Sequence, residues 1–135
     1  MGGKAVVVHD LEQARIALTA ARATSKPITL LSAPAAASAV GPAWFATLVR
    51  TVRGEFPEVE VEAILDCGRA AGRAMAALQA GFNGVVFTGS QGVLLKLADI
   101  GEDQRCTLYD HRPDALDLMA EKDPAAACRA WLEKE

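Results

Sequence analysis

The sequence has little of the residue types that build metal centres and disulfide scaffolds. It contains two histidines and three cysteines in 135 residues, and no pair of cysteines has Cys-x-x-Cys spacing. The odd number and wide spacing of Cys67, Cys106 and Cys128 argue against a disulfide framework and against a closed zinc site. We therefore expect three reduced cysteines, no metal and no cofactor.

Long apolar runs and a basic charge excess are also missing. No run approaches the ~18 apolar residues of a membrane span, and the N-terminus lacks the apolar segment of a signal peptide. The formal net charge is −3, which argues against a general nucleic-acid-binding surface. We therefore expect a cytoplasmic protein with neither a membrane nor a nucleic acid as partner.

What the sequence does contain is a regular alternation of strand and helix patterns. The expected strands are residues 4–9, 28–31, 61–65, 85–87 and 106–109. The expected helices are residues 11–24, 42–53, 68–80, 91–100, 113–121 and 123–134, with a loop over 32–41. Asp10 and Asp123 are the expected N-caps of the first and last helices, with Gln13 in the capping-box position after Asp10.

This alternation predicts an α/β fold with a parallel sheet. We expect a single domain over residues 1–135, built as an open sheet of about five strands with helices on both faces, as in flavodoxin-like proteins. The final helix, about 123–134, is expected as a C-terminal appendage. The alternative is a half (β/α) barrel that completes itself by dimerising.

Polar residues follow every expected strand, at the edge where parallel sheets bind their ligands. They are His9-Asp10, Ser32, Asp66-Cys67-Gly68, Thr88-Gly89-Ser90 and Asp110-His111-Arg112. The same residue types are also common helix caps and turn residues. The sequence therefore leaves two interpretations open, namely a ligand site and a set of ordinary caps.

If a site exists, its anion-binding part is expected around Thr88-Gly89-Ser90. A glycine-containing loop that enters a helix presents backbone N–H groups and the positive end of the helix dipole. Gly89→Val is then expected to abolish binding and to leave folding nearly intact, unless the loop needs glycine at this position for a positive φ. The full set of expected ligand-binding residues is Asp66, Cys67, Gly68, Thr88, Gly89, Ser90 and Arg112.

Catalytic roles are less well defined by the sequence. Cys67 at a helix N-terminus is expected to have a lowered thiol pKa, although no histidine is adjacent in sequence to act as its base. The titratable candidates for catalysis are His9, Asp10, Asp66 and His111. No nucleophile–base pair can be identified among them, so whether the protein is an enzyme stays open.

Residues 80–90, Ala-Gly-Phe-Asn-Gly-Val-Val-Phe-Thr-Gly-Ser, resemble the phosphate-binding strand of several (β/α)₈-barrel synthases and aldolases. In those proteins a segment of the type Ala-Gly-Ala-Asp-Gly-Val-Val-Val-Gly-Ser presents backbone amides to a phosphate. The resemblance covers one βα unit, and the catalytic lysine of such aldolases has no obvious counterpart. It implies a phosphorylated ligand.

The order of elements also resembles the receiver domain of response regulators. In that comparison Asp66 matches the phosphoacceptor, Thr88 the switch hydroxyl, and Asp10 one acid of the magnesium pair. His9 replaces the second acid, and Arg112-Pro113 stands where receivers have Lys-Pro.

The first hypothesis is therefore a small α/β module that binds an anionic or phosphorylated small molecule at its strand ends. The alternative is a receiver-like regulatory or protein-interaction domain without catalysis. The alanine-rich helices and Trp44 add the expectation of a homo-oligomer.

Overall fold

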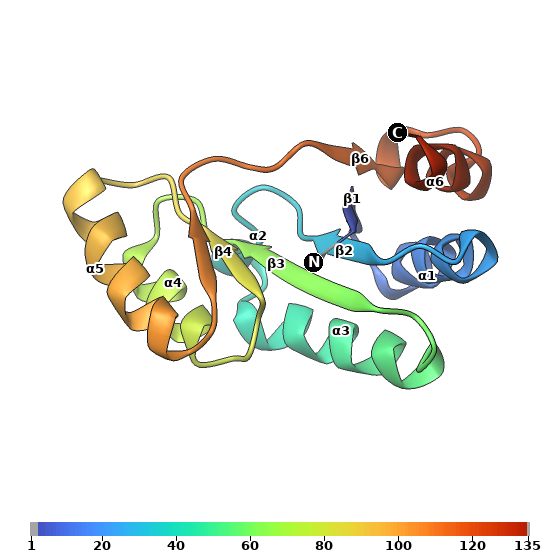
Figure 1. The fold of residues 1–135 in the computed structure, drawn as a ribbon. Coiled ribbons are helices and arrows are strands. Elements are labelled where there is room, and N and C mark those ends of the chain that lie inside the picture. The colour runs from blue at the N-terminus through green and yellow to red at the C-terminus, as the bar shows by residue number, and fades with distance from the viewer. Residues whose placement is uncertain (1–2, 135) are drawn as a thin grey trace. The chain divides into compact units, whose positions relative to one another are not determined.

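The computed structural model describes residues 3–134, which contain six strands, six α-helices and one 3₁₀ turn (Figure 1). In chain order the elements are β1 (Lys4–Val7), α1 (Leu11–Thr24), β2 (Ile28–Leu31), α2 (Ala36–Ala39), α3 (Pro42–Glu55), β3 (Val61–Asp66), α4 (Ala71–Leu78), β4 (Gly84–Val86), α5 (Gln91–Asp103), β5 (Thr107–Tyr109), β6 (Ala115–Asp117), η1 (Leu118–Ala120) and α6 (Pro124–Glu133).

The strands form an open parallel sheet in the order β5-β4-β3-β2-β1-β6. The expected α/β class is therefore confirmed. The strand order differs from the flavodoxin-like order 2-1-3-4-5, because β1 to β5 follow one another without a reversal. Consecutive parallel strands are the arrangement of a (β/α) barrel, so the structure agrees with the half-barrel alternative.

The chain divides into two compact units. Unit 1 consists of residues 1–31, 47–62 and 114–135, and unit 2 of residues 32–46 and 63–113. Strands β1, β2 and β6 lie in unit 1 and strands β4 and β5 in unit 2, whereas α3 and β3 each contribute residues to both units. The expectation of a single domain over 1–135 stays a prediction.

In unit 1, β1 lies between β2 and β6. Val6 is fully buried and is paired in register with Leu30 on β2 and Leu116 on β6. Helices α1 and α6 pack against each other, and the indole N–H of Trp131 on α6 donates to the Ala5 carbonyl over 2.9 Å. Helix α6 is thereby attached to the central strand of this unit.

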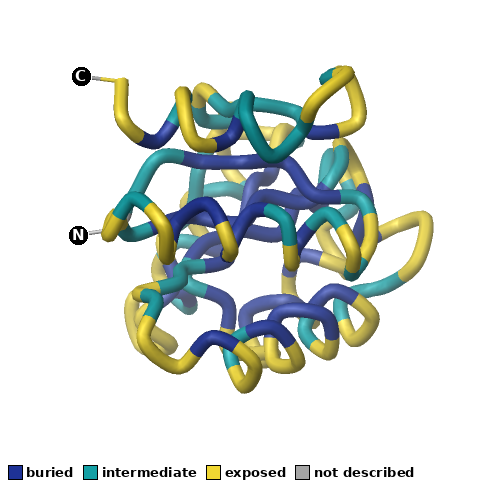
Figure 2. The backbone as a smooth tube through the Cα atoms, turned by 90° about the vertical axis from the view of Figure 1, so that its right-hand side faces the viewer, coloured by how far each residue is buried: buried dark blue, intermediate teal, exposed yellow. Residues whose placement is uncertain are grey.

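In unit 2, β4 lies between β3 and β5. Leu65, Val85 and Leu108 share one register position, and the first two are fully buried. Most residues of β3 and all of β4 are buried, whereas β5 has exposed and intermediate residues. Figure 2 shows that buried and exposed residues alternate along the helices. A Cβ on Gly84 would meet the Tyr109 ring at 2.6 Å, so glycine lets this ring lie across the β4 backbone.

The region after β5 differs from the expectation. The helix predicted over 113–121 is wrong, because this region contains β6 and the short turn η1. β6 satisfies its backbone by pairing with β1, and this non-local pairing overrides the local helix signal. The loop expected over 32–41 contains the four-residue helix α2.

Candidate functional site

The candidate site lies in unit 2, at the carboxyl ends of β3 and β4. Its centre is Asp66, the last residue of β3, which is only 3% exposed. One carboxylate oxygen accepts a hydrogen bond from the Arg112 guanidinium over 2.7 Å, and the other accepts the Gly68 N–H over 2.8 Å. Both oxygens of this buried carboxylate therefore have partners, as burial of a charge requires.

Ser32 completes this arrangement, and we did not expect it among the ligand-binding residues. Its buried hydroxyl accepts the Asp66 N–H over 2.9 Å, and its carbonyl accepts from Arg112 over 3.1 Å. We call Ser32, Asp66 and Arg112 the Asp66 cluster. The sequence signal for Ser32 was its place directly after the second strand; its contacts span 34 and 80 residues.

The loop after β3 lies beside the loop after β4. The Thr88 N–H donates to the Gly68 carbonyl over 2.7 Å. Gly68 has a φ of +56°, and a Cβ there would lie 3.1 Å from the Ala35 Cβ, so this position favours glycine on two grounds. The expected residues Asp66, Gly68, Thr88 and Arg112 are thus brought together.

Thr88, Gly89 and Ser90 lead into α5. The Ser90 hydroxyl accepts the Val93 N–H over 3.3 Å as the N-cap, and the side chains of Thr88 and Ser90 are exposed. A Cβ on Gly89 would lie 2.3 Å from the Phe87 ring. Gly89→Val is therefore not the clean test of binding that the sequence suggested, because it also disturbs a buried aromatic ring.

Cys67 does not present a reactive thiol. Its side chain is buried, and burial raises its pKa to about 12, with the Asp66 charge as a further cause. The expected lowering of the pKa is wrong because desolvation of the thiolate outweighs any effect of the following helix turn. The Cys67 backbone N–H donates to the Val86 carbonyl over 2.9 Å, so this residue supports the site through its main chain.

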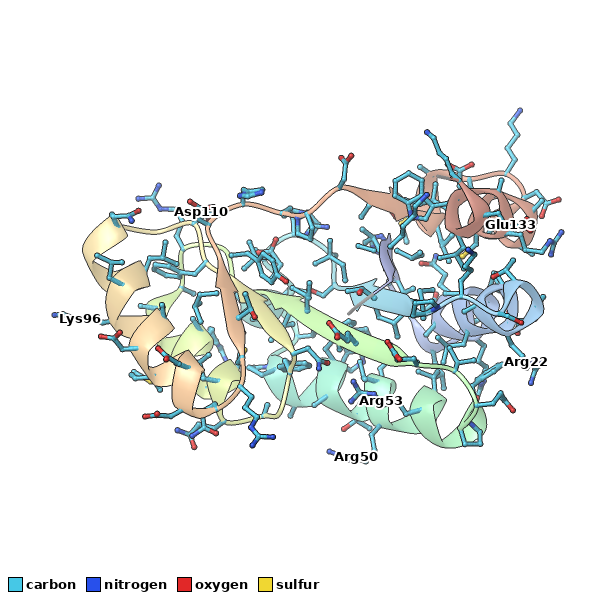
Figure 3. The ribbon with its side chains drawn as sticks, in the orientation of Figure 1. Arg22, Arg50, Arg53, Lys96, Asp110 and Glu133 are labelled. Atoms are coloured by element: carbon cyan, nitrogen blue, oxygen red, sulfur yellow. The ribbon has the colours of Figure 1, made fainter. Side chains whose placement is uncertain are left out.

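His111 is separate from the Asp66 cluster. Its ring Nδ1 lies 2.7 Å from a carboxylate oxygen of Asp110, and both side chains are largely solvent-exposed. The hydrogen bond with His111 lowers the pKa of Asp110. Figure 3 places Asp110 in the segment that follows β5, where water has access to both groups.

His9 and Asp10 lie in unit 1 and make their own pairings there. The Asp10 carboxylate accepts the Gln13 N–H over 2.8 Å as the N-cap of α1. The His9 ring Nε2 lies 2.8 Å from Asp117 on β6, a partner that the sequence did not reveal. The same Asp117 oxygen also accepts the Met119 N–H over 3.0 Å, so two contacts hold this carboxylate.

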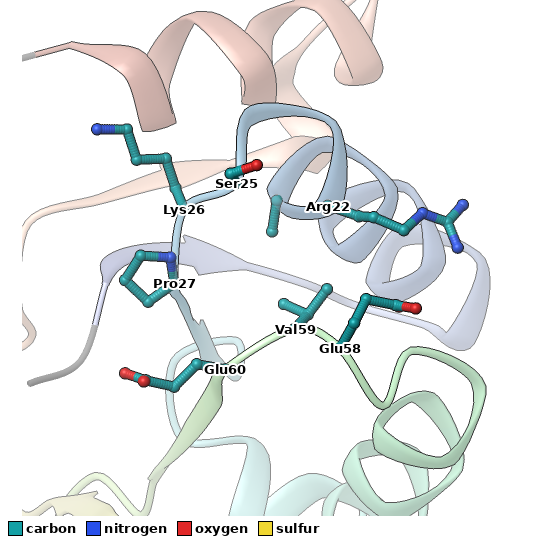
Figure 4. Close-up of a pocket in the computed structure, with 8 residues that line it drawn as sticks. Arg22, Ser25, Lys26, Pro27, Glu58, Val59 and Glu60 are labelled. Carbon is teal, nitrogen blue, oxygen red and sulfur yellow. The ribbon is translucent and has the colours of Figure 1, made fainter.

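Two hollows in unit 1 do not involve the strand-end residues. One, of about 410 Å³, lies where α1 ends and β2 and β3 begin, with Arg22 and Lys26 pointing in different directions (Figure 4). The other, of about 430 Å³, is lined by residues of α1 and α6, among them Arg15 and Arg129. In the first hollow, the labelled charged side chains do not converge on one point (Figure 4).

Two further properties bear on what the chain can hold. Among residues 3–134, no three histidine, cysteine, aspartate or glutamate side chains are grouped to hold a metal ion. Over the same residues, no helix combines the length and the apolar character of a bilayer span.

Comparison with known proteins identifies a family for this chain. Residues 1–96 match the class-II fructose-bisphosphate aldolase family. The chain is also similar to the fructose-bisphosphate aldolase of Xanthobacter flavus, with 32% identity over 83 residues. The aligned region covers 62% of this chain and 23% of that relative. Arg112 and Asp117, the partners of Asp66 and His9, lie beyond residues 1–96, the range that matches the family.

Proposed function

Because the chain belongs to the class-II fructose-bisphosphate aldolase family, we propose that it binds a phosphorylated sugar at the carboxyl ends of β3 and β4. The observation that carries this proposal is the Arg112 guanidinium held beside the Asp66 carboxylate. The exposed Thr88–Ser90 loop is linked to the same place through Gly68. These are the strand ends at which parallel α/β proteins bind ligands.

The chemistry of the site suits a phosphate group. The N-terminus of the 13-residue helix α5 carries the positive end of the helix dipole. The hydroxyls of Thr88 and Ser90 are exposed beside it, and Arg112 supplies a permanent positive charge with several donors. Sugar hydroxyls offer further hydrogen-bonding groups to such a polar loop.

We propose binding rather than turnover. Proton transfer in catalysis needs a group that can reach the substrate. Asp66 is buried and bonded through both oxygens, and the Cys67 thiol is buried with a raised pKa. The arrangement in unit 2 therefore favours a ligand-binding module, and the receiver-like alternative finds no support in the strand order or in the buried Asp66.

The test is a titration of the purified chain with fructose bisphosphate. Calorimetry measures binding, and thermal unfolding measures the stabilisation by the ligand. A ligand at about 100 times its Kd raises the free energy of unfolding by about 2.7 kcal/mol, which shifts the unfolding temperature by several degrees. We expect Arg112→Ala to lose this effect. Arg50→Ala, at an exposed position of α3 labelled in Figure 3, is the matched control.

Three results would contradict the proposal or part of it. The absence of any shift at millimolar fructose bisphosphate would remove the phosphosugar site, and an equal shift with unphosphorylated fructose would remove the role of the phosphate. Release of triose phosphates by the purified chain, lost in Arg112→Ala, would replace binding by turnover.

A further inference from the structure

The guanidinium of Arg112 is bonded to the protein through one nitrogen. Its Nη1 donates to the Asp66 carboxylate over 2.7 Å and to the Ser32 carbonyl over 3.1 Å. Within residues 3–134, its Nε and Nη2 groups make no hydrogen bond and are not buried, and the side chain is 28% exposed. The Nη1 hydrogen bonds therefore fix one side of the guanidinium, and the Nε–Nη2 edge is available to bind a ligand.

The Nε–Nη2 edge of Arg112 has the geometry to donate two hydrogen bonds to two oxygens of one anion. Arg15 in the same chain uses the corresponding atoms, since its Nε and Nη2 donate to the two carboxylate oxygens of Glu55 over 2.8 and 2.7 Å. Phosphate and carboxylate groups are bound in this bidentate way by arginine, whereas a spherical ion is not.

We infer that Asp66 is a positioning residue that aims the free Nε–Nη2 edge of Arg112 at the phosphate of the ligand. The inference rests on the proposed function and adds the group that is bound and the residue that orients it. Asp66 is 3% exposed and is itself held by the Gly68 N–H and by Ser32. A carboxylate fixed in this way restricts the rotation of the arginine side chain that it binds.

For Asp66→Asn, the inference and simple electrostatics predict opposite changes in the affinity for the ligand. Asp66→Asn removes a negative charge close to the proposed phosphate, so charge alone predicts tighter binding of an anion. Loss of positioning predicts weaker binding, because Arg112 must then be ordered by the ligand. The matched control is Asp110→Asn, which removes an exposed carboxylate two residues before Arg112 that pairs with His111.

The experiment measures the Kd of fructose bisphosphate for the wild type, Asp66→Asn, Arg112→Lys and Asp110→Asn. We expect Asp66→Asn and Arg112→Lys each to weaken binding by about tenfold or more, since Lys keeps the charge but loses the paired donors. Asp110→Asn is expected to leave the Kd unchanged or to lower it. In the wild type, thiocyanate, which cannot bridge the paired donors, is expected not to displace the ligand at concentrations where sulfate does.

The outcomes distinguish a failure of the proposed function from a failure of this inference alone. If the wild type does not bind, both the proposed function and this inference fail. If it binds, and Asp66→Asn binds equally or more tightly, or Arg112→Lys is unchanged, only the inference is overturned. If Asp66→Asn does not fold, the Arg112 Nε–H resonance of the wild type, identified by its loss in Arg112→Lys, decides the question. It must shift with fructose bisphosphate, and a constant resonance during binding overturns the inference.

Discussion

Cys67 illustrates how one position acquires its chemistry from its surroundings. It follows Asp66 at the end of β3, and its thiol is buried among the core residues of unit 2. The thiolate is the form that reacts with alkylating agents and disulfides. Because burial raises the pKa of Cys67 to about 12, the reactive form is scarce at neutral pH.

We therefore expect the native protein to react slowly with a thiol-specific disulfide reagent at pH 8. All three cysteines are buried, so native protein should give almost no rapid colour change, whereas unfolded protein should titrate three thiols. Mass spectrometry of the labelled peptides identifies the sites. Rapid stoichiometric labelling of Cys67 in the folded protein would show that its thiol is accessible after all.

Local residue roles were predictable, and distant partners were not. Asp10, Ser90 and Asp123 cap the helices that follow them, since a cap needs only a backbone N–H two or three residues away. The ion pair of Asp66 with Arg112 joins residues 46 positions apart. No spacing rule specifies such a pair, although both members were expected at strand ends.

At the scale of one element, helix α5 contains two glycines in different environments. A Cβ on Gly92 would meet nothing within 4 Å, whereas a Cβ on Gly101 would lie 2.6 Å from the Cys106 carbonyl oxygen. Gly101 is buried where the helix approaches the start of β5. Substitution by alanine is therefore expected to have different effects on stability at the two positions.

We expect Gly101→Ala to lower the free energy of unfolding by about 1–3 kcal/mol, because the backbone must move to admit the methyl group. Gly92→Ala is the matched control in the same helix and is expected to be neutral or stabilising by up to about 1 kcal/mol. Urea unfolding of the two variants measures the difference. Equal stabilities would mean that α5 and β5 are not closely packed.

The element after β5 shows why local pattern alone misassigned a segment. Pro113 at a first turn and a few apolar residues favour a helix over 113–121. The structure instead uses Ala115–Asp117 as β6, which pairs with β1. Strand β1 lies more than 100 residues earlier in the chain, so the local sequence pattern around 113–121 cannot reveal this pairing.

At the scale of the whole molecule, the three buried thiols couple stability to alkaline pH. Burial raises the pKa of Cys67 to about 12 and those of Cys106 and Cys128 to about 11, from a reference value of 9.0. The unfolded chain loses these protons above pH 9, whereas the folded chain retains them. Their contribution is therefore fully present below pH 9 and is lost as pH rises toward 11–12.

We expect the free energy of unfolding to fall between pH 9 and pH 11 and to fall less steeply in Cys67→Ala. Urea unfolding at pH 7.5, 9, 10 and 11 measures the slope for each protein. Cys67→Ala can be less stable at pH 7.5, and this constant difference does not affect the comparison of slopes. An identical slope in both proteins would show that the Cys67 thiol ionises as easily in the folded state as in the unfolded one.

Homo-oligomerisation of the whole molecule stays a prediction. Trp44, which we expected at a protein interface if it points outward, is 40% exposed. Large aromatic side chains are enriched at such interfaces.

The sequence by itself determined the α/β class, most helix and strand positions, the caps and the set of polar strand ends, because periodicity and capping act over a few residues. Its resemblance at residues 80–90 also indicated a phosphate-binding aldolase unit. The tertiary structure decided the consecutive strand order, the pairing of β6 with β1 and the contacts of Asp66 with Ser32 and Arg112. It also decided the raised pKa of the Cys67 thiol. These features depend on which distant segments meet and on how completely they exclude water, and an alternation of strands and helices is compatible with several such arrangements.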